Sequence, residues 1–190
     1  KNPAYVTATA DLDIAAQGVA RSAFGLQGQK CSSCSVVYVQ RPVRDEFVAR
    51  LTRFAQQLKV GNPEQRDVFM GPLYSPQAAE RFRANVKMAE RDGKVVFGGH
   101  FIDGGAGGDY AQPTLVEVPQ GHVLAREEQF LPLLVLRCFD RLQEALDDGN
   151  AVRYGLTAGI YTTDPGELDL FLDRAEAGVL YANRASGATT

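Results

Sequence analysis

The sequence predicts an α/β fold in which a mostly parallel sheet lies between two layers of helices, a three-layer αβα arrangement. Two observations predict it. Segments with apolar residues at helical spacing alternate with short β-branched or apolar runs for most of the length, and the run over residues 133–139 is nearly continuous, as in a strand covered on both faces. The 190 residues, 45% of them hydrophobic, can form one domain with a sizeable core.

Helical spacing of apolar residues predicts helices over residues 12–23, 42–58, 76–92, 142–146 and 165–175. The first carries a stripe of small residues suited to close packing against a sheet. Residues suited to helix ends stand beside these segments: Asp11, Gly25, Pro42, Gly61, Ser75, Gly93, Asp140 with Gln143, and Asp164. The helices are therefore expected to be separate elements joined by short loops.

Strands are expected at residues 36–39, 95–97, 114–118, 133–139, 158–162 and 179–183. Residues 100–113 are rich in glycine, and the run over 104–108 lacks the spacing of a phosphate-binding loop. This segment is therefore interpreted as a flexible surface loop.

Composition excludes several classes of protein. A net charge of −3 gives no electrostatic reason to bind nucleic acid or an anionic membrane, and no apolar run approaches the length that spans a bilayer. Three cysteines, Cys31, Cys34 and Cys138, form an odd set that does not suggest a disulfide framework, so a cytoplasmic protein is expected. The start at Lys1, without a methionine, suggests a piece excised from a longer chain.

Cys31 is the candidate nucleophile. It lies in the segment 28–35, at the junction between a predicted helix and a predicted strand, where reacting groups are commonly presented on loops. Gly28 allows the backbone to turn closely just before it, and the adjacent Lys30 carries a positive charge that favours the thiolate. The alternative is a buried cysteine with only a packing role.

Other interpretations of the cysteines are weaker. A structural zinc site needs four ligands, and no second pair of ligands stands at suitable spacing from Cys31 and Cys34. If residues 31–34 are extended, the two thiols point to opposite faces, which disfavours redox exchange. A cysteine hydrolase would need His100 or His122 as its base, and each is more simply a solvated loop residue.

Seven landmarks in order make the chain resemble the catalytic domain of the aldehyde dehydrogenase superfamily, and most of all its 1-pyrroline-5-carboxylate (glutamate semialdehyde) dehydrogenase branch. The resemblance covers essentially all 190 residues. The landmarks are Lys1-Asn2-Pro3, Gly28-Gln29-Lys30-Cys31, Gly71-Pro72-Leu73, Pro113-Thr114-Leu115, Glu127-Glu128-Gln129-Phe130, Asn150 with Tyr154-Gly155-Leu156-Thr157, and Asn183-Arg184.

The resemblance implies covalent oxidation of an aldehyde, in this branch of L-glutamate 5-semialdehyde to glutamate. Cys31 would form a hemithioacetal, a hydride would pass to NAD, with NADP as the alternative, and water would hydrolyse the thioester. The backbone N–H of Cys31 would stabilise the oxyanion. Glu128 would hold the ribose hydroxyls of the cofactor beside Phe130. Ser32 and the pair Gly187-Ala188 would hold the substrate carboxylate, and no metal is implied.

The sequence differs from the family pattern in two places, and several functional groups of the family are not among these residues. Leu131 replaces a glycine of the family, and the pair Gly187-Ala188 comes one residue early after Asn183-Arg184, so that the true pair could follow Thr190. In the family, the general base, a second oxyanion donor and the nucleotide-binding domain precede the position of Lys1.

Residues 1–190 are therefore expected to be the thiol-bearing catalytic domain of a longer homo-oligomeric enzyme, inactive when isolated. The alternative is a non-catalytic binding or assembly module that retains the fold.

Overall fold

The computed structural model describes residues 1–105 and 107–186. Over these ranges the strands are β1 (Pro3–Val6), β2 (Val36–Gln40), β3 (Lys94–Phe97), β4 (Phe101–Ile102), β5 (Tyr110–Ala111), β6 (Thr114–Glu117), β7 (Leu133–Phe139), β8 (Thr157–Tyr161) and β9 (Val179–Ala182). The helices are α1 (Leu12–Phe24), α2 (Arg44–Gln57), α3 (Pro76–Asp92), α4 (Val123–Arg126), α5 (Leu142–Asn150) and α6 (Pro165–Arg174), with short 3₁₀ turns η1 (Gly25–Gly28) and η2 (Arg41–Val43).

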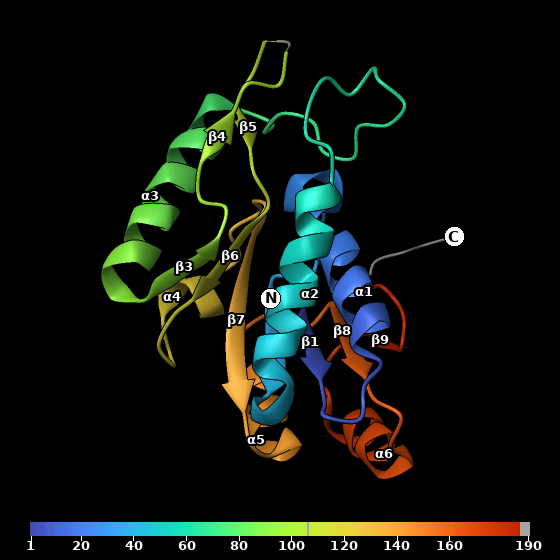
Figure 1. Ribbon diagram of the computed structural model, residues 1–190. Helices are drawn as coiled ribbons and strands as arrows, with labels where there is room; N and C mark the ends of the chain where they lie inside the picture. The colour runs from blue at the N-terminus through green and yellow to red at the C-terminus, as the bar shows by residue number, and fades with distance from the viewer. Residues whose placement is uncertain (106, 187–190) are drawn as a thin grey trace.

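The described residues form a seven-stranded sheet in the order β3-β6-β7-β2-β1-β8-β9. Neighbouring strands are parallel except β3, which runs antiparallel to β6. Figure 1 shows these strands with helices packed around them. The predicted fold class, a three-layer αβα arrangement with a mostly parallel sheet, is confirmed.

The helices divide between the two faces of the sheet. Apolar side chains of α1 and α2 form one core with Val37 and Val39 of β2, whereas those of α3, α5 and α6 form the other core with Val36 and Tyr38. Strand β7 contributes to both cores, as the apolar run of its sequence predicts. The alternation of side chains along each strand thus supplies both apolar layers.

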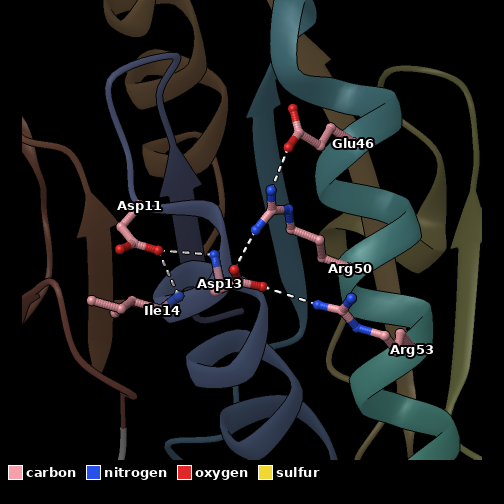
Figure 2. Close-up of polar contacts among 6 residues, drawn as sticks. All are labelled: Asp11, Asp13, Ile14, Glu46, Arg50 and Arg53. Carbon is pink, nitrogen blue, oxygen red and sulfur yellow. Dashed lines mark hydrogen bonds and ion pairs between the residues drawn. The ribbon is translucent and has the colours of Figure 1, made fainter.

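Charged side chains join α1 to α2 at the surface (Figure 2). Asp11 caps α1 by accepting hydrogen bonds from the backbone N–H groups of Asp13 and Ile14. The carboxylate of Asp13 then forms ion pairs with Arg50 and Arg53 of α2. Because these groups are exposed or half-exposed, the buried apolar contacts between the helices contribute more to stability than the ion pairs do.

Strand β1 was not predicted, although it pairs with both β2 and β8 near the middle of the sheet. It has only four residues, it begins with Pro3, and only Val6 in it is β-branched, so it lacks the composition that marks a strand. Its residues are nevertheless fully buried. Its position depends on neighbours far away in the sequence.

The interpretation of residues 100–113 as a flexible surface loop was wrong in part. Strands β4 and β5 pair in antiparallel fashion, and Tyr110 and Ala111 are buried. Helix α5 also begins differently: Arg141 occupies its N-cap position, so Asp140 does not cap it but pairs with Arg41 instead. In the described part of the chain, no helix has both the length and the apolar character needed to cross a membrane.

Candidate active site

The loop that carries Cys31, residues 26–35 (the thiol loop), begins with a run of left-handed backbone. Leu26, Gln27 and Gly28 have φ values of 51°, 58° and 68°, and the chain then makes a turn in which the N–H of Ser33 donates to the carbonyl of Lys30. Side chains other than glycine rarely adopt such φ values, so the loop stores strain that surrounding contacts must offset.

The two cysteines of this loop lie in different environments. Cys31 is exposed, whereas Cys34 is buried among the side chains of α1 and α2 and its thiol donates to the carbonyl of Val36. Burial raises the pKa of the Cys34 thiol to about 12. The thiol of Cys31 is therefore accessible to reagents in solution, whereas that of Cys34 is not.

Asn2 joins the thiol loop to the sheet through all of its side-chain hydrogen-bonding groups. Its Nδ2 donates to the carbonyl oxygens of Cys31, at 2.8 Å, and Ser33, at 2.9 Å, and its Oδ1 accepts from the N–H of Thr157 at 3.2 Å. Because the Asn2 side chain is only 6% exposed, water cannot readily replace these partners. The loop is thereby fixed to the amino ends of β1 and β8.

Gly28 brings a second loop, residues 127–131, against the thiol loop. A Cβ on Gly28 would lie 2.2 Å from the carbonyl oxygen of Leu131, a distance that no side chain could occupy. The left-handed residue of the second loop is Phe130, with φ of 58°, and the ring of Phe130 packs edge-to-face on that of Tyr74. The sequence expectation that Gly28 permits a close turn is confirmed.

The landmark Gly71-Pro72-Leu73 also contacts the thiol loop. Gln27 donates a side-chain hydrogen bond to the carbonyl of Pro72, and the carbonyl of the Gln29 side chain accepts from the N–H of Tyr74. Both bonds are 3.0 Å long. They hold the residues on either side of Gly28, of which Gln27 is the left-handed one, so three segments distant in sequence meet at one loop.

The two acidic residues of the second loop differ in their contacts. Glu127 accepts hydrogen bonds from the hydroxyl of Tyr154 and from Arg153, and these donors hold the pKa of Glu127 below its ordinary value. The hydroxyl of Tyr154 also accepts from the N–H of Glu128. Glu128 itself is exposed, and its carboxylate has no hydrogen-bonding or ion-pairing partner among the described residues.

A narrow cleft joins the two loops. Lys30 and Ser33 line one side of it, and Glu128 and Phe130 line the other. Lys1 also lines the cleft. Burial lowers the pKa of this lysine to about 8, and its ammonium group donates to the carbonyl of Ser35. The residues predicted to bind the cofactor therefore lie across a cleft from the loop that carries the predicted nucleophile.

A second cavity, of about 240 Å³, lies beside the thiol loop. Ser32 lines it together with Arg21, Lys30 and Phe69, and Ser186 lines it from the segment that follows β9. The predicted carboxylate-binding pair Gly187-Ala188 lies outside the described residues.

The histidines lie in other surroundings. Both ring nitrogens of His122 are occupied, one by Asp92 and the other by the N–H of Leu124, and the ring of His100 contacts the carbonyl of Gly98. Neither histidine hydrogen-bonds to Cys31 within the described ranges, so the geometry gives no support to a cysteine hydrolase. A search of the same ranges finds no group of three His, Cys, Asp or Glu side chains that could hold a metal ion.

Comparison with known proteins assigns the fold and the two loops to a family. The model of the Aldehyde dehydrogenase family matches residues 1–190. The chain belongs to this family. The resemblance inferred from the seven landmarks is thereby confirmed.

The family members similar to this chain differ in substrate. The 1-pyrroline-5-carboxylate dehydrogenase of Anoxybacillus flavithermus (strain DSM 21510 / WK1) is 34% identical over 186 residues, covering 97% of this chain and 36% of that protein. The lactaldehyde dehydrogenase of Escherichia coli (strain K12) is 37% identical over 187 residues, covering 97% of this chain and 39% of that protein. This chain thus spans less than two fifths of the length of these relatives.

A solved structure of this family has the same fold. The 1-pyrroline-5-carboxylate dehydrogenase from Thermus with bound NAD superposes with a TM-score of 0.91 at 32% sequence identity, over 97% of this chain and 35% of that chain. The three-layer arrangement is therefore a property of the family.

Sequence reasoning missed the residues that position the thiol. Asn2 stood within a landmark, but no role was assigned to it, and Gln27 and Gln29 were not singled out. A signal was present for Asn2: an amide side chain directly before a short apolar segment can satisfy the polar groups of a neighbouring turn. The spacing of residues could not predict that this amide bonds to the carbonyl of Cys31, 29 residues away.

Gly28→Ala tests the contact between the two loops. The methyl group would meet the carbonyl of Leu131, and we expect the free energy of unfolding to fall by about 3 kcal/mol or more, from left-handed strain and overpacking together. Gly121→Ala is the matched control, since Gly121 also has a positive φ but no neighbouring atom within 4 Å, and it should cost about 1 kcal/mol. Urea unfolding measures the free energy of unfolding of both variants. Equal losses in the two would contradict the contact between Gly28 and Leu131.

Asn2→Ala tests the attachment of the thiol loop. Two carbonyls and one N–H lose their partner, and we expect the free energy of unfolding to fall by about 3 kcal/mol. In the unaltered protein iodoacetamide should label Cys31 well before Cys34, and Asn2→Ala should make Cys34 labelling faster.

The control for this substitution is Asn62→Ala, which removes one surface hydrogen bond, to the N–H of Glu64, and should cost less than about 1 kcal/mol. Peptide mapping of the labelled protein reads out each cysteine. Unchanged protection of Cys34 in Asn2→Ala would show that Asn2 does not hold the loop.

Proposed function

We propose that this chain is the thiol-bearing catalytic domain of an NAD-dependent aldehyde dehydrogenase in which Cys31 is the nucleophile. The observation that carries the proposal is an exposed thiol on a strained loop that Asn2 and Gly28 hold in place, in a chain of this family. A cysteine with only a packing role would be buried, as Cys34 is.

The chemistry that follows uses the thiolate of Cys31. Its Sγ attacks the aldehyde carbon and forms a carbon–sulfur bond, and the carbonyl oxygen becomes an oxyanion. The backbone N–H of Cys31 has no acceptor among the described residues, so it is available to donate to that oxygen. Loss of hydride from the same carbon leaves a thioester, and attack by water releases the carboxylate and returns the thiol.

The residues of the second loop suit the cofactor. An exposed carboxylate with no partner among the described residues, as on Glu128, can accept hydrogen bonds from two ribose hydroxyls, and the half-buried ring of Phe130 offers an apolar surface beside them. Bound NAD would supply the hydride acceptor. Tyr154 keeps Glu128 in position through the backbone N–H.

We propose L-glutamate 5-semialdehyde as the substrate, with glutamate as the product. Several relatives are 1-pyrroline-5-carboxylate dehydrogenases, but others act on different aldehydes. The cavity beside the thiol loop favours an aldehyde that carries a carboxylate, because Arg21, Lys30 and the hydroxyl-bearing Ser32 line it. Gly187 and Ala188 are proposed to complete the carboxylate site.

We further propose that the general base and most of the cofactor site are supplied from outside residues 1–190. The relatives are more than twice as long as this chain, which leaves room for them. Residues 1–190 alone should then bind no NAD tightly and show no aldehyde oxidation. Turnover by this segment alone would contradict this division of roles.

Steady-state assays of NADH formation by the full-length protein test the function. Cys31→Ala should lower kcat by about a thousandfold or more, whereas Cys138→Ala, which removes a thiol remote from the site, should leave it unchanged. Glutamate 5-semialdehyde should exceed lactaldehyde in kcat/KM by about a hundredfold, because only the former carries the carboxylate.

The outcomes separate the alternatives. Full activity in Cys31→Ala would remove the catalytic assignment. Loss of activity together with a preference for lactaldehyde would retain the dehydrogenase and reject the semialdehyde. No activity with any aldehyde in the unaltered protein would favour a non-catalytic module.

A further inference from the structure

Lys1 is a buried charged residue to which the proposed reaction assigns no role. The residue is only 4% exposed. Its ammonium group carries three N–H donors, and among the described residues its one hydrogen bond is to the carbonyl of Ser35, at 3.3 Å. A buried ammonium group with so few partners is unfavourable, so a further interaction is expected to offset the cost of burying its charge.

The position of Lys1 places this charge where the thiol loop meets the second loop. Lys1 and Glu128 line the same narrow cleft, and Lys1 also lines a small pocket together with Tyr154 and Glu176. The hydroxyl of Tyr154 accepts the backbone N–H of Glu128. One cleft therefore contains an ammonium group and a carboxylate, neither of which forms an ion pair within the described part of the chain.

Negative charge near Lys1 attracts its ammonium group. Burial lowers the pKa of Lys1 to about 8, whereas charges on Cys34, Glu128 and Glu127 raise this pKa. Burial also raises the pKa of the Cys34 thiol to about 12, so this thiol is uncharged near neutral pH. Glu127 is already held by the hydroxyl of Tyr154. The carboxylate left to respond to Lys1 is that of Glu128.

Glu128 needs such an attraction because its side chain is exposed and its carboxylate has no other partner among the described residues. A free glutamate side chain samples several rotamers, and a ligand that fixes one of them must offset the lost entropy. A charge in the lining of the cleft favours the rotamers that direct the carboxylate inward. Attraction between partly buried charges is screened less by salt and water than attraction at the surface.

We propose that Lys1 is a positioning residue for the cofactor: its ammonium group draws the Glu128 carboxylate into the cleft and so prepares it to accept the ribose hydroxyls of NAD. The inference rests on the proposed function and adds a dependence of cofactor affinity on the charge of Lys1. Lys1 acts through Glu128 and does not itself touch the cofactor.

The charge of Lys1 makes the affinity for NAD depend on pH. With a pKa of about 8, Lys1 is mostly an ammonium group at pH 7 and mostly a neutral amine at pH 9. The attraction on Glu128 is therefore present at pH 7 and is lost as the pH rises through about 8. Other titratable groups line the cleft or the adjoining pocket, so the test must separate Lys1 from them: Lys30, Cys34, Tyr154 and Glu176.

Isothermal titration calorimetry of the full-length protein with NAD, without aldehyde, tests the proposal. The unaltered protein should bind NAD about fivefold more weakly at pH 9 than at pH 7, which corresponds to the freedom regained by one side chain. Lys1→Met should bind about fivefold more weakly at pH 7 and show no further loss at pH 9. A fall with pH that persists in Lys1→Met would assign the titration to another group and overturn the proposal.

Lys87→Met is the matched control, because it removes the same charge from an exposed position on α3. It should leave both the affinity for NAD and its dependence on pH unchanged. An effect equal to that of Lys1→Met would show that the net charge of the protein matters and that the position of Lys1 does not.

A double-mutant cycle tests whether Lys1 acts through Glu128. Glu128→Gln should weaken NAD binding, and adding Lys1→Met to it should cause no further loss, because the group that Lys1 positions is already altered. Losses that multiply in the double variant would mean that Lys1 affects the cofactor by another route, and the proposal would be wrong.

The experiment stays decisive where Lys1→Met fails to fold, which urea unfolding would reveal. In that case the unaltered protein should still lose affinity between pH 7 and pH 9, and Glu128→Gln should not. Absence of NAD binding to the unaltered protein would overturn both this inference and the proposed function. NAD binding that neither pH nor Lys1→Met changes would overturn this inference alone.

Discussion

The side chain of Asn2 is the point on which the geometry of the thiol loop depends. Three hydrogen bonds converge on a side chain that is almost fully buried, and they connect the backbone of Cys31 and Ser33 to β8 through Thr157. Because these partners lie where water does not compete, each unsatisfied group would cost about 1 to 3 kcal/mol. The thiol therefore stands at the amino edge of the central strands, and not on a loose loop.

Strain in the same loop is offset by contacts from two distant segments. The left-handed residues before Cys31 would not persist in an isolated peptide. Gln27 and Gln29 bond to the segment around Pro72, and Gly28 lies against Leu131. The strain and the contacts together hold the thiol loop and the second loop, residues 127–131, at a fixed separation, which is the preorganisation that the proposed covalent reaction needs.

The sheet has a polar cavity or cleft at each of its two edges. At the amino edge, loops bring an exposed thiol and an exposed carboxylate together, and at the carboxyl edge the divergence of α2 and α5 opens a cavity around Arg137. Both arise because parallel strands align all their starts at one edge and all their ends at the other. The apolar layers between the edges keep the cleft and the cavity apart.

The sequence by itself determined the five longer helices, the long strand β7 and the fold class, and it singled out Cys31 as a candidate nucleophile, because periodic burial and short ordered motifs are local properties that spacing displays. It did not predict the short helix α4. It did not determine the short strand β1, the three partners of Asn2, or the approach of Gly28 to Leu131. These depend on residues brought together across 29 to 155 positions of chain, and only the tertiary packing of the strands and loops decides which of them meet.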